Sequence, residues 1–306
     1  MRLRTPGLGE MTSFASETKD ELCRAPVSKK CCAVAEMYGV FAFCGVFSPT
    51  EARIITGNRK FAKRAETLMQ TAYGLTFDEE RGGDGGKISL VVRDAAKIAA
   101  IVASFGFGEL VSMHVNLGVL EEECCRVSFL RGAFLAGGSV NNPYKSYHLE
   151  LISRHRSAAR ETAALLGEAG FSPKLSERSG ADVIYFKRSG AIEELLTLLG
   201  APNHAMRVME AKIEKEMNQS VNRRVNCDTA NVSKTVIASE KHTDFIEKLR
   251  PFLSDLPDRL RITAELRLAY PELSITELGA MFSPPISKPG LNHRLRKLRE
   301  IAESVM

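Results

Sequence analysis

The residues best suited to chemistry lie near the C-terminus, in the stretch SKPGLNHRLRKLRE (287–300). No acidic residue occurs from Leu278 to Arg299, whereas amide, imidazole and cationic side chains are frequent. Asparagine can pair with adenine and arginine with guanine at base edges, and lysine or arginine neutralises phosphates. We therefore predict a DNA-contacting surface, with Asn292 and Arg296 as candidates for base edges. Its residues are Ser287, Lys288, Asn292, His293, Arg294, Arg296, Lys297 and Arg299.

A helix must hold these side chains on one face. Ser287 is a suitable N-cap, and a proline follows in the first turn. At 100° per residue, Leu291, Leu295, Leu298 and Ala302 share an apolar stripe, opposite the polar residues. A capping box at Ser274 and Glu277 begins a shorter helix just before it, and FSPPI (282–286) makes the turn. The pattern indicates a helix-turn-helix; the alternative is an amphipathic tail helix with a solvated basic face.

The cysteines are the next reactive group, and their spacing argues against a metal site. Adjacent cysteines are poor disulfide partners for each other, and a structural zinc site usually has the spacing C-x₂₋₄-C, which is absent. We therefore expect buried small hydrophobic side chains, with no metal and no cofactor. The seven cysteines are Cys23, Cys31, Cys32, Cys44, Cys124, Cys125 and Cys227.

Two further stretches resemble sites without fitting their chemistry. ERGGDGGK (80–87) is glycine-rich, but a strand-like segment follows it, whereas a phosphate-binding loop opens a helix. Glu121, Glu122 and Glu123 are adjacent, and adjacent residues of a helix do not face each other. We interpret the first as a hairpin turn and the second as favourable charge at a helix N-terminus.

Composition places few limits on function. The 306 residues are 44% hydrophobic and 26% charged, with a net charge of +5. This mild positive charge permits nucleic-acid binding without indicating it. No window holds 18 consecutive apolar residues, and the N-terminus lacks the apolar core of a signal peptide. We expect a cytoplasmic protein with no membrane partner.

Two apolar, glycine-containing stretches organise the first two thirds of the chain. MYGVFAFCGVF (37–47) places Gly39 and Gly45 where LRGAFLAGGSV (130–140) places Gly132 and Gly138. Each glycine costs a helix about 0.8–1.0 kcal/mol relative to alanine. We therefore predict that the two helices approach closely along this face, the alternative being two unrelated buried helices.

The segments that follow each glycine stretch repeat the same order. Each is followed by a strand-like segment, a helix, a hairpin and a further helix. Gly138 follows Gly45 by 93 residues, and Gly200 follows Gly106 by 94. A nearly fixed period with a repeated element order indicates an internal duplication.

These motifs resemble a known family. The two glycine stretches are similar to the motif helices of LAGLIDADG homing endonucleases. Together with SFASETKDEL (13–22), NRRVNCDTAN (222–231) and SKPGLNHRLRKLREIA (287–302), they resemble the bacterial WhiA family of sporulation and cell-division transcription regulators. The resemblance covers nearly the whole chain from Ser13. It implies an α+β fold in which a duplicated αββαββα domain precedes a small all-α helix-turn-helix domain.

The resemblance also allows a test for nuclease chemistry. The nucleases hold Mg²⁺ through an acidic residue at the eighth position of each motif, because hard cations need oxygen ligands. Here those positions are Cys44 and Gly137, and the sixth positions, Ala42 and Leu135, are apolar. We therefore expect no enzymatic activity and no catalytic residues.

The expected domains are as follows. Residues 1–12 would be disordered, 13–203 the LAGLIDADG-like domain with repeats at about 33–106 and 124–200, 204–243 a helical and polar linker, and 244–306 the helix-turn-helix domain. A methionine stripe at Met206, Met209 and Met217 favours a core face. The asparagine-rich segment 218–234 is interpreted equally as a hinge or as a phosphate contact.

Further basic residues leave the role of the first domain open. Arg59 and Lys60 begin a predicted helix, where they form either a DNA-facing surface or a solvated helix face; Arg223 and Arg224 lie in the linker. The resemblance implies a sequence-specific DNA-binding regulator of division, chromosome segregation or sporulation genes. Its partners would be promoter DNA and other transcription or cell-division proteins, on the nucleoid. The alternatives are a residual Mg²⁺-dependent endonuclease and a scaffold for an acidic protein partner.

Overall fold

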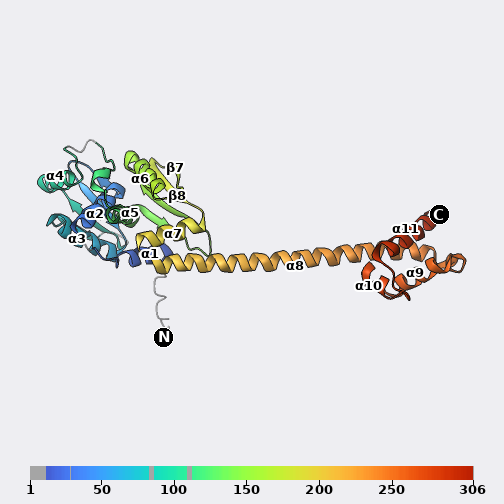
Figure 1. Cartoon of the computed structure of the whole chain (residues 1–306). Helices are drawn as coiled ribbons and strands as arrows, with labels where there is room; N and C mark the ends of the chain where they lie inside the picture. The colour runs from blue at the N-terminus through green and yellow to red at the C-terminus, as the bar shows by residue number, and fades with distance from the viewer. Residues whose placement is uncertain (1–11, 28, 83–85, 109–111, 306) are drawn as a thin grey trace, which may run out of the picture. The chain divides into compact units, whose positions relative to one another are not determined.

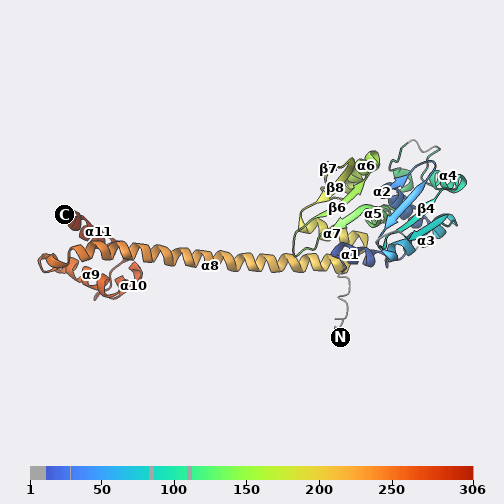
Figure 2. The same cartoon turned by 180° about the vertical axis from the view of Figure 1, so that it is seen from behind.

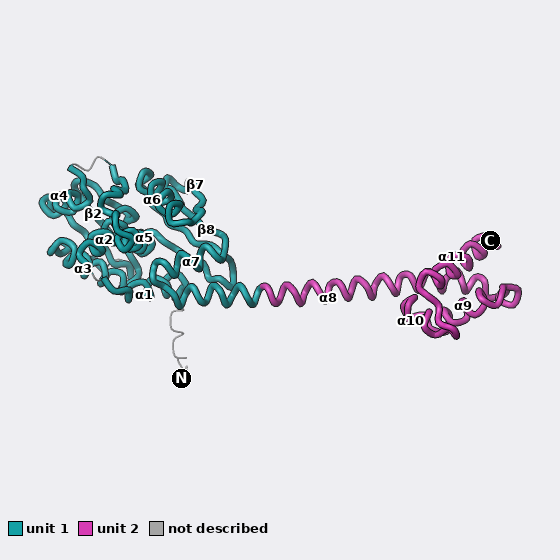
Figure 3. Tube along the Cα trace, in the orientation of Figure 1, with its two compact units in different colours: residues 1–215 teal, residues 216–306 magenta. Residues whose placement is uncertain are grey.

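The computed structural model describes residues 12–27, 29–82, 86–108 and 112–305, and the chain forms two compact units, Met1–Lys215 and Glu216–Met306 (Figure 3). The boundary falls inside one helix, α8 (Pro202–Lys248). We expected a separate linker at 204–243. Instead, Ala205 and Val208 of α8 belong to the core of the first unit, and Ile246 to that of the second. The disorder expected at 1–12 concerns residues outside the described ranges, except Thr12.

The first unit repeats one arrangement twice, which confirms the αββαββα duplication. The residue pattern did not predict the short strands β1 and β5. Strands of two or three residues are too short to show an alternation of apolar and polar side chains. The first half comprises α2 (Lys30–Phe43), β1 (Val46–Phe47), β2 (Ala52–Thr56), α3 (Arg59–Tyr73), β3 (Glu79–Gly82), β4 (Ile88–Val92) and α4 (Ala95–Ser104). The second half comprises α5 (Glu123–Gly137), β5 (Gly138–Val140), β6 (Leu149–Ser153), α6 (Arg156–Glu168), β7 (Lys174–Arg178), β8 (Ala181–Phe186) and α7 (Ser189–Leu199).

Each half contains one four-stranded antiparallel sheet. The strand orders are β1-β2-β4-β3 and β5-β6-β8-β7, with Ile54 opposite Leu90 in the first sheet and Leu151 opposite Ile184 in the second. These four side chains are buried, and α3 and α6 pack against their respective sheets. Figure 1 shows α2 and α5 at the centre of this unit, where the two halves meet, and Figure 2 shows the same arrangement from behind.

The contact between α2 and α5 depends on two glycines. A Cβ added to Gly39 would lie 1.9 Å from the carbonyl oxygen of Phe129, and one added to Gly132 would lie 2.0 Å from that of Glu36. The predicted close approach is therefore confirmed for this pair. Gly45 was expected to take part, but it lies beyond the end of α2 and has no atom within 4 Å of its added Cβ.

A buried ion network joins the same two helices. Glu36 of α2 is fully buried, and Arg64 of α3 binds its two carboxylate oxygens at 2.5 and 2.8 Å. Arg131 of α5 lies 3.4 Å from the same carboxylate and donates to the carbonyl of Leu199 at 2.7 Å. Removing one partner from such a network leaves an unpaired buried charge, which costs about 3–5 kcal/mol.

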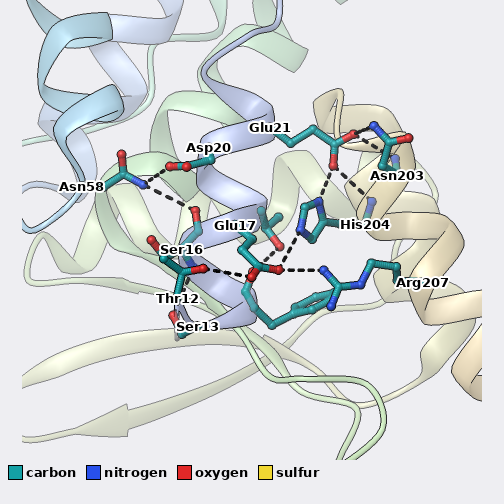
Figure 4. A network of polar contacts seen from close by, with 12 residues as sticks. Thr12, Ser13, Ser16, Glu17, Asp20, Glu21, Asn58, Asn203, His204 and Arg207 are labelled. Atoms are coloured by element: carbon teal, nitrogen blue, oxygen red, sulfur yellow. Dashed lines mark hydrogen bonds and ion pairs between the residues drawn. The ribbon is translucent and has the colours of Figure 1, made fainter. Parts of the chain in front are cut away.

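Helix α1 (Phe14–Leu22) is attached to the first turns of α8 by a polar network (Figure 4). Glu21 accepts hydrogen bonds from the backbone and side chain of Asn203 at 2.8 and 2.7 Å, and it also pairs with His204. Glu17 accepts from Arg207 at 2.7 Å, and this bond holds the pKa of Glu17 below its usual value. The acidic residues of SFASETKDEL therefore connect the N-terminal helix to a segment nearly 200 residues later.

Helix α8 bears on one open alternative and corrects one expectation. The asparagine-rich segment 218–234 forms no break, since α8 runs unbroken from Pro202 to Lys248. The methionine stripe is not a core face: Met206, Met209 and Met217 are 59%, 44% and 63% exposed. The buried residues of this part of α8 are instead His204, Ala205, Val208 and Ala211.

The second unit is all-helical. After α8 come a 3₁₀ segment, η3 (Arg250–Asp255), and three helices, α9 (Asp258–Ala269), α10 (Ile275–Ala280) and α11 (Lys288–Ser304). Among the described residues no helix is long and apolar enough to cross a membrane. The core of this unit is formed by Ile246, Leu249, Leu260, Ala264, Leu278, Phe282, Leu291, Leu295, Leu298 and Ala302.

Replacing Gly39 by alanine should destabilise the first unit strongly. The new Cβ would overlap the backbone of α5, which cannot rotate away as a side chain could. We expect the free energy of unfolding to fall by about 3 kcal/mol, at the upper end of overpacking costs. Urea unfolding followed by circular dichroism measures the change.

Gly167→Ala is the matched control. Gly167 lies in the last turn of α6, is exposed and has no atom within 4 Å of an added Cβ. Alanine there should stabilise the helix by up to about 1 kcal/mol. If both substitutions behave alike, the close contact between α2 and α5 does not limit stability.

Candidate nucleic-acid interface

Helix α11 is held by its N-cap and by its apolar stripe. The Ser287 side chain accepts a hydrogen bond from the amide of Gly290 at 3.4 Å, and a proline lies in the first turn. Leu291, Leu295 and Leu298 are at most 2% exposed. The predicted stripe is therefore the face by which α11 packs on the rest of the unit.

The preceding helix and turn hold α11 in place. Ser274 and Glu277 form the predicted capping box, with hydrogen bonds of 2.9 and 3.3 Å. The amide of Ile286 donates to the carbonyl of Gly279 at 2.9 Å, and a Cβ on Gly279 would lie 2.5 Å from the carbonyl oxygen of Ile286. Gly279 thus lets the turn pass close to α10, which completes the helix-turn-helix.

Most of the predicted contact residues are exposed in the structure. Arg296 lies 3.9 Å from Glu300 and Arg299 lies 3.6 Å from Glu303, contacts that are weak and screened at a surface. These arginines could therefore exchange their partners for phosphates or bases at little cost. The exposed members of the set are Ser287, Lys288, Asn292, His293, Arg296, Lys297 and Arg299.

Arg294 differs from the others. It is half-buried, its guanidinium lies 5.4 Å from the centre of the Phe282 ring, and it donates to the carbonyl of Arg259 at 3.5 Å. These contacts turn it toward α9 and the turn. Sequence spacing could not separate Arg294 from its neighbours, because its partners come from other elements.

The exposed face of α11 has two parts. Asn292, Arg296 and Arg299 line a groove of about 580 Å³ between α11 and the end of α8, whereas His293 and Lys297 do not. Lys241 and Lys248 of α8 line the same groove. These two lysines were not singled out from the sequence. The only feature of the sequence that could have indicated them is their separation of seven residues, which places two lysines on one helix face just before the helix-turn-helix.

Two residues of this unit, Arg267 of α9 and His242 of α8, lie where these two helices meet. Arg267 is 1% exposed and donates to the carbonyl of Leu273 at 2.7 Å, with Ser239 of α8 3.4 Å away. Burial lowers the pKa of His242 to about 4, and the positive charges of Arg267 and Arg299 act in the same direction. The end of α8 is therefore an integral part of this unit.

The basic residues expected in the first unit have a different setting. Lys60 is paired with Asp20 at 2.5 Å, while Arg59 is exposed at the start of α3. On the outer sheet face, Arg53 lies 3.4 Å from Glu51 and Arg81 lies 2.7 Å from Glu79. Carboxylates therefore neutralise much of the positive charge that a DNA-binding face would need. In the second unit, Arg223 and Arg224 are exposed on α8.

The two motif positions lie at equivalent helix ends. Cys44 caps the C-terminus of α2, and its thiol lies 3.2 Å from the carbonyl of Val46. Gly137 ends α5, where an added Cβ would lie 2.3 Å from the carbonyl oxygen of Ile152. A carboxylate side chain at Gly137 would therefore overlap the backbone of β6.

The structure corrects the interpretation of the cysteines. We expected no metal-ligating constellation, because no spaced pair exists in the sequence. The fold nevertheless brings Cys31, Cys32, Cys124 and Cys125 together, with all four sulfur atoms within 4.8 Å of one another. Spacing along the chain missed the cluster because its two halves come from different helices.

The fold and the exposed basic helix define a two-unit protein that joins a duplicated LAGLIDADG-like domain to a helix-turn-helix domain. The sequence matches the WhiA LAGLIDADG-like domain over residues 126–218 and the WhiA C-terminal HTH domain over residues 221–302. The chain belongs to the WhiA family.

Relatives along the whole chain support this membership. A probable cell division protein WhiA from Bacillus subtilis is 38% identical over 307 residues, covering 96% of this chain and 97% of the relative. One from Heliobacterium modesticaldum is 35% identical over 313 residues, covering 95% and 96%. The fold is similar to that in the crystal structure of full-length DUF199/WhiA from Thermotoga maritima, which aligns with a TM-score of 0.61 at 24% identity, covering 96% of this chain and 99% of that one.

The second unit should lose stability as the pH falls below about 6.5. In the unfolded chain His242 takes up a proton near its ordinary pKa of 6.5, whereas in the folded unit it stays neutral until about pH 4. Unfolding is therefore favoured between these values. We expect a loss of about 1–2 kcal/mol by pH 4, with solvent screening taken into account.

The loss should be smaller in His242→Gln, which cannot titrate. Urea unfolding, followed by hydrogen exchange of peptides from α9 to α11, measures the stability of the second unit separately from that of the first. His293→Gln on the exposed face of α11 is the control and should keep the pH dependence of the unmodified protein. An equal loss in His242→Gln would contradict the assignment.

Proposed function

We propose that this protein is a sequence-specific, double-stranded DNA-binding regulator without nuclease activity. The observation that carries the proposal is the exposed polar face of α11, where Asn292 and Arg296 stand on a helix fixed by its buried leucines. A rigid helix with amide and guanidinium groups on one face suits the major groove. Asn292 and Arg296 would contact base edges, and Lys288, Lys297 and Arg299 would contact phosphates.

The groove between α11 and α8 extends this interface. Lys241 and Lys248 line this groove together with Arg296 and Arg299, and the carboxylates among its lining residues are Asp244 and Glu303. We infer that the two lysines of α8 contact the phosphate backbone next to the bases that α11 reads. Phosphate contacts fix the register of a protein on DNA, whereas base contacts supply sequence preference.

The first unit would serve as a platform. Its motif positions hold Cys44 and Gly137 in place of carboxylates, so they offer no pair of oxygen ligands for Mg²⁺. The charge pairing on its outer sheet face also disfavours a DNA-binding role. By its family, the regulated processes would be cell division, chromosome segregation or sporulation, in the cytoplasm at the nucleoid, with promoter DNA and other transcription or division proteins as partners.

Binding of the full chain to genomic-fragment duplexes should depend steeply on salt and prefer some fragments. Lys297→Gln should weaken binding to all fragments alike and reduce the slope of log K against log salt by about 1. Fluorescence anisotropy at several salt concentrations measures both. The control is Arg261→Gln in the same unit, where Asp258 at 2.7 Å and Glu265 at 3.7 Å already offset the charge.

Arg296→Ala should act differently from Lys297→Gln. Because a paired arginine–guanine contact specifies one position, its loss should cost about 1–3 kcal/mol and relax preference at a single base pair. A uniform loss across sequences would place Arg296 on phosphate instead. Binding without sequence preference, or Mg²⁺-dependent nicking of supercoiled plasmid by the unmodified protein, would overturn the proposed function.

A further inference from the structure

Four cysteines meet where α2 and α5 begin. Cys31 and Cys32 are the second and third residues of α2, and Cys124 and Cys125 are the second and third residues of α5. Each residue of the second pair follows its counterpart by 93 residues, the offset that also separates Gly138 from Gly45. The cluster is therefore produced by the internal duplication, with one pair contributed by each half.

The glycine contact brings the two pairs within reach of each other. Gly39 and Gly132 draw the helix axes together two turns further along, so the first turns of α2 and α5 are also adjacent. All four sulfur atoms lie within 4.8 Å of one another. Zinc–sulfur bonds of about 2.3 Å require sulfur atoms about 3.8 Å apart, a contraction that small side-chain rotations supply.

Without an ion, burial and the neighbouring thiols raise the pKa of Cys32 and raise that of Cys125 to about 12, so a bound cation must displace their protons. All four cysteines lie in the first turns of α2 and α5, where the helix dipoles offset part of the cost of forming thiolates. Cys32 and Cys125 are buried, Cys124 is half-buried and Cys31 is exposed, which leaves an entry path from solvent. Packing alone gives no reason for an exposed cysteine to converge with three others.

We propose that Cys31, Cys32, Cys124 and Cys125 bind one Zn²⁺ ion per chain. Four sulfur ligands in a compact arrangement match the tetrahedral geometry of a structural zinc site, and soft thiolates select zinc over Mg²⁺ or Ca²⁺. The ion has four protein ligands and no open position, so its role is to fasten the two halves of the first unit at the N-terminal ends of their central helices. This site is independent of the DNA interface on α11.

Cobalt substitution in the full-length protein tests the site directly. The protein is purified under reducing conditions, stripped of metal and titrated with Co²⁺. We expect saturation at one equivalent, with sulfur-to-cobalt charge-transfer bands and the intense visible bands of tetrahedral cobalt, both of which Zn²⁺ should abolish. Adding Zn²⁺ should also raise the midpoint of thermal unfolding, because the ion binds only the folded state.

Two variants separate the site from general thiol binding. Cys31→Ser together with Cys124→Ser alters the two more exposed ligands, so folding should persist by circular dichroism while the tetrahedral spectrum and the zinc-dependent shift are lost. Cys227→Ser removes an exposed cysteine of α8 and should leave both unchanged. Elemental analysis of protein isolated without added metal should give one zinc per chain for Cys227→Ser.

Three results would overturn the proposal. One is a wild-type protein that shows only the spectrum of hydrated cobalt. Another is a double variant that binds Co²⁺ as the wild type does. The third is mass spectrometry of the freshly isolated wild type that shows disulfides between these cysteines. The cluster would then be a covalent link and not an ion site.

Discussion

The close contact between α2 and α5 at Gly39 and Gly132 is the constraint on which the first unit depends. Each glycine admits a backbone carbonyl of the other helix at a distance that no Cβ would allow. That separation places Glu36 against Arg131 and brings four cysteines together at one end of the pair. At the other end it leaves the positions of Cys44 and Gly137 filled by a thiol and by backbone. The close contact between these two helices therefore positions both the ion network and the sulfur cluster.

The second unit is assembled by a different interaction. No pair of glycines draws its helices together; instead, leucines of α11 and the buried guanidinium of Arg267 attach α9 and α11 to the end of α8. Because α8 supplies one wall of the basic groove, the proposed recognition surface includes residues outside the three short helices. The half-buried His242 belongs to the same packing, where burial and the positive charges of Arg267 and Arg299 disfavour a charged imidazole.

Charge has different uses in the two units. In the first, Arg53, Arg64 and Arg81 each have a carboxylate partner within 3.4 Å, so their charge is used within the fold. On α11, Lys297 is exposed, and the exposed Arg296 has a weak contact with Glu300 at 3.9 Å and a hydrogen bond with His293 at 3.1 Å. Cations without strong internal partners can bind an external polyanion with little loss of internal interactions. This difference supports the proposed DNA contact on the helix-turn-helix unit and the proposed supporting role of the duplicated domain.

The sequence alone determined what depends on local periodicity and capping: the 93-residue repeat, the Ser274 capping box and the leucine stripe of α11. It also indicated the Gly39–Gly132 contact, because an unfavourable residue repeated at equivalent positions needs a packing reason. Tertiary structure decided which side chains of the same type share a role. It left Gly45 free, exposed the methionines of α8, turned Arg294 toward α9, and joined Cys31 and Cys32 to Cys124 and Cys125. Spacing along a chain reports neighbours within one element, whereas these outcomes depend on contacts between elements that only the folded backbone brings together.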